Sequence, residues 1–212
     1  MKYKYILLDW DGNLARTLDI WLLAYRKVLD DRSIIKTDQE IAAGFGLLSK
    51  QMVDWGVEDI DAAMLQADTI AKRNLPNVEL YPDALFVLEK LHERGHKLAL
   101  ITTSTHENVV HLLEKYGIKQ LFSTIVAGDD TTNHKPHPEP LELALKQLGG
   151  DKEYAVMIGD SDKDLGAAKN AGVDSILFYP DEHQKFYDLE SLKSYSPTHI
   201  VNDFKEILEI AA

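Results

Sequence analysis

Residues 3–12 read YKYILLDWDG, and this stretch decides how the rest of the chain is interpreted. Its apolar part, with the first carboxylate at its end, predicts a strand over residues 3–9 that is buried on both faces. Two aspartates, Asp9 and Asp11, stand at the end of this strand, separated by one residue and followed by Gly12. Because neighbouring carboxylates repel each other, we expect a positive charge close to them.

Further apolar runs predict more strands, and helical patterns separate most of them. The runs cover residues 97–102, 123–127, 154–158, 174–178 and 198–201. Helical periodicity that is followed by a glycine predicts helices over residues 82–94, 106–116, 138–148 and 162–171. The polar stretch 180–197 predicts mostly loop with a short helix near 188–194. Strands that alternate with helices predict an α/β fold with right-handed crossovers and a parallel sheet covered on both faces.

Residues 18–75 interrupt this alternation because they contain no good strand pattern. Helical stripes recur instead, and one of them contains Ile20, Leu23, Ala24 and Val28. The pattern predicts a small helical insertion between the first strand and the next αβ unit.

Composition excludes several classes of function. With 23 basic and 35 acidic residues the formal net charge is −12, which disfavours sequence-independent binding to nucleic acid or to an anionic membrane. The absence of cysteine excludes disulfides, a thiolate nucleophile and a cysteine zinc site. No apolar stretch has membrane-spanning length and the N-terminus does not resemble a signal peptide, so we expect a cytoplasmic protein.

Polar side chains gather at the predicted carboxyl ends of the strands, which is the edge where open parallel sheets bind ligands. Four carboxylates, one lysine and several hydroxyls are expected there. They belong to Asp9, Asp11, Thr102, Thr103, Ser104, Lys135, Asp160 and Asp164. Carboxylate, carbonyl and water oxygens suit Mg²⁺, which also binds substrate phosphate. The lysine and the hydroxyls supply the charge and the donors that a phosphoryl group needs.

Four segments in this order resemble the motifs of the haloacid dehalogenase-like superfamily, most of whose members are phosphatases. They are ILLDWDGNL at 6–14, LALITTST at 98–105, HKPHP at 134–138 and GDSDKD at 159–164. The resemblance extends from residue 5 to about residue 173, and each motif ends its own predicted strand or follows it. It resembles most the subgroup of phosphoglycolate phosphatase and beta-phosphoglucomutase, which carries a helical cap.

The resemblance implies a fold and a domain organisation. The core would be a Rossmann-like doubly wound parallel sheet formed by residues 1–17 and 77–212. Residues 18–76 would form a helical cap domain inserted after the first strand.

The resemblance also implies catalytic roles. Asp9 would be the nucleophile that forms an aspartyl-phosphate. Asp11 would protonate the leaving alcohol and then activate water. Thr102 and Lys135 would hold the phosphoryl oxygens.

The resemblance to this superfamily also implies a Mg²⁺ site. Its ligands would be Asp9, the backbone carbonyl of Asp11, and Asp160. Asp164 would bind the ion directly or through water, or would orient Lys135.

Three positions depart from the family pattern. Asn13 replaces the usual Thr, and it can still form a local hydrogen bond. Arg16 replaces an Asp, where it would alter the hinge to the insertion or place a cation near the remote end of the substrate. Thr103 stands where Asn or Ser is common, so we count it with Arg16, Thr102 and Lys135 as a candidate for substrate binding.

The function expected is Mg²⁺-dependent hydrolysis of a small phosphorylated metabolite by a monomer or homodimer, without nucleic acid or membrane as partner. The alternatives are a phosphomutase of the same superfamily, a non-catalytic binding protein, and a haloacid dehalogenase, which would lack Asp11. Phosphoglycolate and pyrophosphate are substrates typical of the family, and the sequence does not decide between them. Trp10, Trp21 and Trp55 are interpreted as packing residues.

Overall fold

The computed structural model of the protein describes residues 1–212. A sheet of six parallel strands forms its centre, in the order β3-β2-β1-β4-β5-β6. The strands are β1 (Tyr5–Leu8), β2 (Lys97–Ile101), β3 (Phe122–Val126), β4 (Ala155–Gly159), β5 (Asp174–Phe178) and β6 (His199–Val201). The predicted parallel α/β fold is confirmed, and each strand lies within two residues of its predicted bounds.

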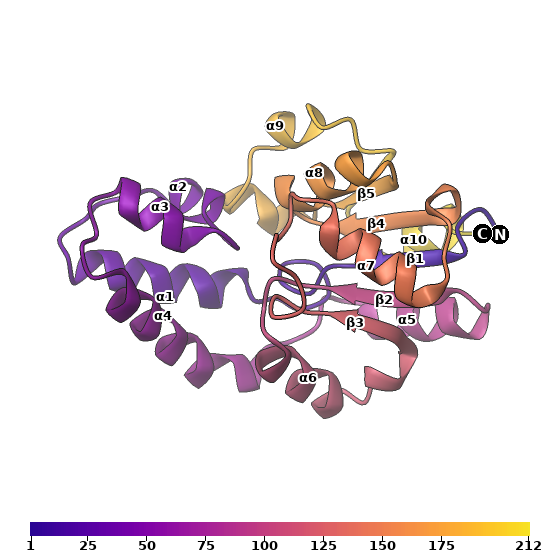
Figure 1. Ribbon diagram of the computed structural model, residues 1–212, viewed down its shortest axis with the longest axis horizontal. Coiled ribbons are helices and arrows are strands. Elements are labelled where there is room, and N and C mark those ends of the chain that lie inside the picture. The colour runs from indigo at the N-terminus through magenta and orange to yellow at the C-terminus, as the bar shows by residue number, and fades with distance from the viewer.

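Helices cover both faces of the sheet (Figure 1). They are α5 (Ala84–Glu93), α6 (His106–Lys115), α7 (Glu139–Leu148), α8 (Asp162–Ala171), α9 (Leu189–Lys193) and α10 (Phe204–Ile210). Side chains of β1 alternate between two apolar clusters. Leu7 packs with α7 and α8, whereas Ile6 and Leu8 belong to the cluster that contains α5 and α10. The sheet is therefore doubly wound, as expected.

The strand register brings distant parts of the chain to one edge. Leu8 at the end of β1 lies opposite Leu100 of β2 and Ile158 of β4. The backbone N–H of Asp9 continues this ladder by donating to the carbonyl of Ile158, at 3.0 Å. The residues that follow β1, β2 and β4 consequently lie together at the carboxyl edge of the sheet.

Residues 18–74 contain four helices and no strand. They are α1 (Leu18–Asp30), α2 (Asp38–Ala43), α3 (Leu48–Asp54) and α4 (Ile60–Asn74). Figure 1 shows them as a group beyond the end of the sheet from which β1 leads into α1. The stripe predicted for α1 was partly wrong, because Leu23 is 56% exposed whereas Leu22 and Tyr25 are buried. The buried face of α1 is rotated from the predicted stripe because the helix packs against α4 and also faces the core.

Residues 181–185 form a 3₁₀ helix that the sequence pattern does not predict. It places His183 in the interior, where the ring Nε2 lies 2.8 Å from the hydroxyl of Tyr81. The expected short helix near 188–194 is present as α9. No helix combines the length and the hydropathy that crossing a bilayer requires.

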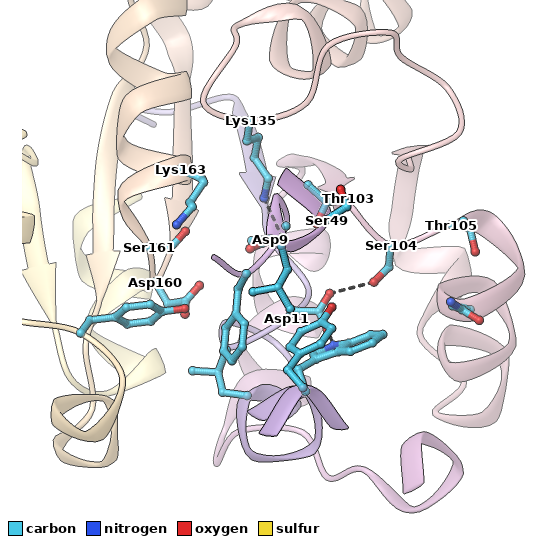
Figure 2. Close-up of a pocket in the computed structure, with 18 of the residues that line it drawn as sticks. Asp9, Asp11, Ser49, Thr103, Ser104, Thr105, Lys135, Asp160, Ser161 and Lys163 are labelled. Atoms are coloured by element: carbon cyan, nitrogen blue, oxygen red, sulfur yellow. Dashed lines mark hydrogen bonds and ion pairs between the residues drawn. The ribbon is translucent and has the colours of Figure 1, made fainter. Parts of the chain in front are cut away.

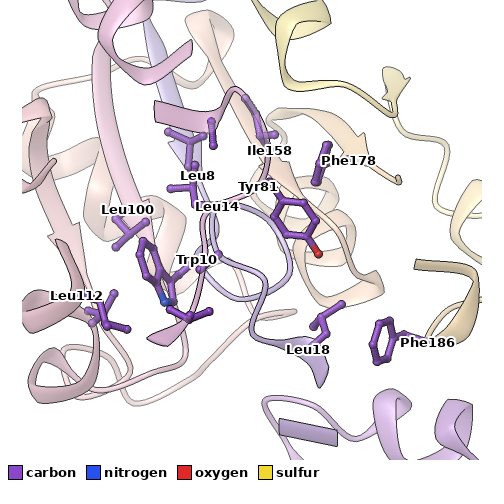
Figure 3. Close-up of a cluster of buried hydrophobic side chains, with 14 of the residues drawn as sticks. Leu8, Trp10, Leu14, Leu18, Tyr81, Leu100, Leu112, Ile158, Phe178 and Phe186 are labelled. Carbon is purple, nitrogen blue, oxygen red and sulfur yellow. The ribbon is translucent and has the colours of Figure 1, made fainter. Parts of the chain in front are cut away.

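Trp10 anchors the turn that follows β1. Its side chain is almost fully buried among apolar residues that include Leu8, Leu14 and Leu100 (Figure 3). Its carbonyl accepts the N–H groups of residues 13, 14 and 15, so the chain folds back tightly around it. The packing role predicted for this tryptophan is confirmed, and the turn that it fixes carries both aspartates.

Replacing Trp10 by alanine should lower the free energy of unfolding by about 3–5 kcal/mol, the usual cost of truncating a buried aromatic side chain. Denaturant unfolding followed by circular dichroism measures it. Leu65→Ala, at a position that is 68% exposed, serves as the control and should change stability by less than about 0.5 kcal/mol. A cost below about 1 kcal/mol for Trp10→Ala would show that this side chain does not anchor the turn.

Candidate active site

Asp9 and Lys135 form a buried ion pair at the carboxyl edge of the sheet (Figure 2). The Nζ of Lys135 lies 2.8 Å from Oδ1 of Asp9 and 2.6 Å from Oδ1 of Asp164, and it donates to the carbonyl of Ile101 at 3.0 Å. Only 3% of Lys135 is exposed. The positive charge expected beside the aspartates is thus present and has a full set of hydrogen-bond acceptors.

Burial perturbs the acid–base properties of this cluster. It raises the pKa of Asp9 to about 8, with a further increase from the charge of Asp164 and an opposing effect of Lys135. Burial and the neighbouring charges of Asp164 and Asp9 raise the pKa of Asp160 well above its usual range. Burial alone would lower the pKa of Lys135, but the charges of Asp164 and Asp9 outweigh it and raise that pKa. One lysine therefore does not balance three buried carboxylates.

The same carboxylates fit a hard divalent cation. One oxygen each of Asp9, Asp160 and Asp164 lie within 4.8 Å of one another. Oδ2 of Asp160 is buried and has no hydrogen-bond partner, as expected of an oxygen that binds a cation. The oxygens of Asp164 already accept from Lys135 and from the N–H and hydroxyl of Ser161. Of the roles expected for Asp164, this contact favours the orientation of Lys135.

Gly12 leaves the space that this arrangement needs. Its φ is +73°, a conformation that favours glycine. A Cβ at this position would lie 2.3 Å from Oδ2 of Asp160. Any other residue would consequently push the turn against the unpartnered oxygen.

Asp11 lies apart from the ion pair and faces the cavity beside it. Its Oδ2 accepts from the hydroxyl of Ser104 at 2.9 Å and lies 3.5 Å from that of Thr102. Its Oδ1 accepts from the indole Nε1 of Trp21 at 2.9 Å. Trp21 belongs to α1, so its interpretation as a packing residue was incomplete. The inserted helices thus contact one of the two aspartates directly.

The candidate residues that follow β2 have different environments. Thr102 is buried, and its hydroxyl accepts from the backbone N–H of Ser104 at 3.0 Å. Thr103, Ser104 and Thr105 line the cavity, whereas Thr102 does not. Thr102 therefore lies beneath the cavity wall and orients the turn.

Arg16 does not reach the cavity. It is exposed, and its guanidinium lies 3.1 Å from the carboxylate of Glu182. The backbone N–H of Arg16 pairs with the carbonyl of Glu79, and the side chain extends toward the 181–185 helix. The structure does not bring Arg16 together with the other site residues predicted from the sequence.

The cavity has a volume of about 240 Å³ and is lined from both the core and the inserted helices. Several of its lining residues were not predicted from the sequence, namely Trp21, Tyr25, Phe45, Lys163 and Tyr187. Leu18, Trp21 and Tyr25 share a helical face, so their spacing held a signal for one wall. No local pattern marks Tyr187, which the chain places there by long-range folding.

The sequence profile of one family, described as haloacid dehalogenase-like hydrolase, matches residues 6–178. A phosphoglycolate phosphatase of Aliivibrio fischeri is 35% identical over 225 residues, which covers 98% of this chain and 96% of the relative. A pyrophosphatase PpaX of Oceanobacillus iheyensis is 29% identical over 215 residues, which covers 99% of this chain and 97% of the relative.

Solved structures support the same relationship. A predicted phosphoglycolate phosphatase from Haemophilus somnus superposes with a TM-score of 0.84 at 27% identity, over 100% of this chain and 99% of its own. CbbY from Rhodobacter sphaeroides in complex with phosphate has a TM-score of 0.76 at 22% identity, over 97% of this chain and 96% of its own. The second likeness supports the fold alone.

Mg²⁺ should raise the midpoint of thermal unfolding, because a ligand that binds only the folded state stabilises it by about 2.7 kcal/mol at 100 times its dissociation constant. Asp160→Asn should abolish this increase. Asp162→Asn removes a neighbouring, partly exposed carboxylate and should preserve it. Differential scanning calorimetry with and without Mg²⁺ measures the effect. A wild-type midpoint that does not respond to Mg²⁺ would contradict the site.

Proposed function

Because this chain belongs to the haloacid dehalogenase-like hydrolase family, we propose that it is a phosphatase that hydrolyses a small phosphomonoester through an aspartyl-phosphate. One observation carries this proposal. Asp9 is held by Lys135 at 2.8 Å beside a cavity that Asp11 also faces. A nucleophile, a cation and a second carboxylate at one cavity are the groups that such a reaction requires.

The reaction would proceed in two balanced steps. In the first, an oxygen of Asp9 attacks phosphorus while the bond from phosphorus to the leaving oxygen breaks, and Asp11 gives its proton to that oxygen. In the second, Asp11 takes a proton from water, and the water oxygen attacks phosphorus while the bond to Asp9 breaks. Inorganic phosphate leaves, and both aspartates return to their initial states.

The hydrogen bonds of Asp9 indicate which of its oxygens attacks. Oδ1 accepts from the backbone N–H of Trp10 at 2.7 Å and pairs with Lys135 at 2.8 Å. Both contacts end on this oxygen, so Oδ2 is the one available for attack. The two contacts also fix the rotation of the carboxylate, which reduces the entropy that is lost when the reacting atoms meet.

Charge on the transferred group would be stabilised from several sides. Lys135 and the hydroxyl of Thr103, both of which line the cavity, are proposed to hold phosphoryl oxygens, whereas the buried Thr102 is proposed to orient the turn that carries Thr103. Asp9, the carbonyl of Asp11 and Asp160 are proposed to hold Mg²⁺. Such an ion supplies positive charge to the transferring phosphoryl group when it is bound.

Residues 18–76 are proposed to act as a cap domain over a core formed by residues 1–17 and 77–212. Contacts between the two parts support this division. Lys163 of α8 donates to the carbonyl of Ala43 at 2.6 Å, and Phe45 packs against Phe186 with ring centroids 6.5 Å apart. A cap in this position excludes water from the reaction and contacts the leaving group.

Asp9→Asn should abolish phosphate release from p-nitrophenyl phosphate in the presence of Mg²⁺, because an amide keeps the shape of the side chain but does not attack phosphorus. Circular dichroism should show a folded variant. Residual activity of a tenth of the wild-type value or more would mean that Asp9 is not the nucleophile.

Asp11→Asn should lower kcat by about 10²–10⁴-fold for alkyl phosphates, the range expected when general acid–base catalysis is lost. The loss should be smaller for p-nitrophenyl phosphate, whose leaving group needs little protonation. Steady-state kinetics with both ester types test this difference, and Leu65→Ala serves as an exposed control. Equal losses for the two ester types would argue against a role of Asp11 in proton transfer.

A further inference from the structure

One side of the cavity is an aromatic wall formed by Trp21, Tyr25 and Phe45. The rings of Trp21 and Tyr25 are stacked, with centroids 5.7 Å apart and an interplanar angle of 19°. The centroids of Tyr25 and Phe45 lie 5.9 Å apart, so the three rings are continuous. The hydrophobic side chains of Leu18, Leu48 and Met64 extend this surface. The part of the cavity contributed by the inserted helices is therefore largely apolar.

Only two cations, Lys135 and Lys163, line the cavity, and both already have acceptors. Lys135 is held by Asp9 and Asp164 at the proposed site of phosphoryl transfer. Nζ of Lys163 lies 2.6 Å from the carbonyl of Ala43 and 2.9 Å from a carboxylate oxygen of Asp162. Neither lysine has a free charge to offer to a second anionic group.

The cations of the inserted helices point elsewhere. Most of them form ion pairs with acidic residues of the same insertion, namely Arg26, Lys27, Arg32, Lys36 and Lys72. The remaining two, Lys50 and Arg73, do not line the cavity. The insertion thus contributes no positive charge to the region where a leaving group would lie.

Apart from the carboxylates of Asp9, Asp11 and Asp160, the other polar side chains of the lining are uncharged. They include the hydroxyls of Ser49, Thr103, Ser104 and Thr105 (Figure 2), together with the hydroxyls of Ser161, Tyr25 and Tyr187 and the amide of Asn108. Such groups bind neutral hydroxyls and carbonyls as donors or acceptors. An anion in this region would instead meet the carboxylate of Asp11 and the electron-rich faces of the aromatic wall without a cation to pair with.

The geometry points to a substrate whose leaving group is uncharged and carries an apolar face, rather than a carboxylate or a second phosphate. This inference rests on the proposed phosphatase function and specifies its substrate class. It separates this chain from a relative that acts on phosphoglycolate or pyrophosphate, because the leaving group of each of those substrates is an anion. It also disfavours a phosphomutase, which must hold a second phosphate.

A matched pair of esters tests the charge preference directly. 2-Hydroxyethyl phosphate and phosphoglycolate have nearly the same size, but one ends in a hydroxyl and the other in a carboxylate. The wild-type protein with Mg²⁺ should show a kcat/KM at least about tenfold higher for 2-hydroxyethyl phosphate, since an unpaired charge is discriminated against strongly. Benzyl phosphate should be hydrolysed at least as well as 2-hydroxyethyl phosphate, because its ring can pack on the aromatic wall.

Two neighbouring residues of α4 provide a matched pair of variants. Met64 lines the cavity, whereas Leu65 is 68% exposed and lies outside it. Met64→Lys should raise kcat/KM for phosphoglycolate relative to 2-hydroxyethyl phosphate by about tenfold, because it supplies the missing cation. Leu65→Lys adds the same charge to the same helix and should leave this ratio unchanged.

The possible outcomes separate this inference from the proposed function. If the wild-type protein hydrolyses phosphoglycolate or pyrophosphate as well as 2-hydroxyethyl phosphate, the inference is wrong while the phosphatase function stands. An equal change of the ratio in both lysine variants would also overturn it, since the effect would then not come from the cavity. Failure to release phosphate from any ester, p-nitrophenyl phosphate included, would overturn the proposed function and the inference with it. The wild-type comparison decides the question even if Met64→Lys does not fold.

Discussion

The buried charge of Lys135 is the constraint on which the site depends. A lysine with so little exposure is tolerated only when its hydrogen bonds and its charge are satisfied. Asp9, Asp164 and the carbonyl of Ile101 do this, and they come from the ends of β1 and β2 and from α8. The ion pairs therefore tie together segments that lie far apart in sequence, and the central position of β1 in the sheet makes this possible.

Much of the fold could be predicted from sequence because its signals are local. Buried strands appear as apolar runs, and glycines mark the ends of the helices between them. The buried face predicted for α1 was partly wrong, as the exposure of Leu23 shows. Which face of this helix is buried depends on how it packs against α4 and the core. Residues 204–210 form a helix, α10, that the apolar pattern did not single out.

The candidate site likewise contains residues that could be predicted from the sequence and residues that could not. Asp9, Lys135, Asp160 and Asp164 follow predicted strands, so the topology of a parallel sheet was enough to bring them together. The direction of Arg16, away from the cavity, could not be predicted because it depends on a backbone pairing with Glu79, which is distant in sequence. The contact of Trp21 with Asp11 could not be predicted for a similar reason, since it depends on how the inserted helices lie over the sheet.

The hydrogen bond from Trp21 to Asp11 gives the molecule an internal optical reporter. Indole emission responds to the polarity and charge around the ring, and the three tryptophans occupy different surroundings. Trp10 is buried in the core, Trp55 lies under the ammonium group of Lys36, and Trp21 donates its N–H to the carboxylate of Asp11 in the cavity. We therefore expect the part of the fluorescence that comes from Trp21 to respond when a ligand enters the cavity, so that binding could be followed in time without a label.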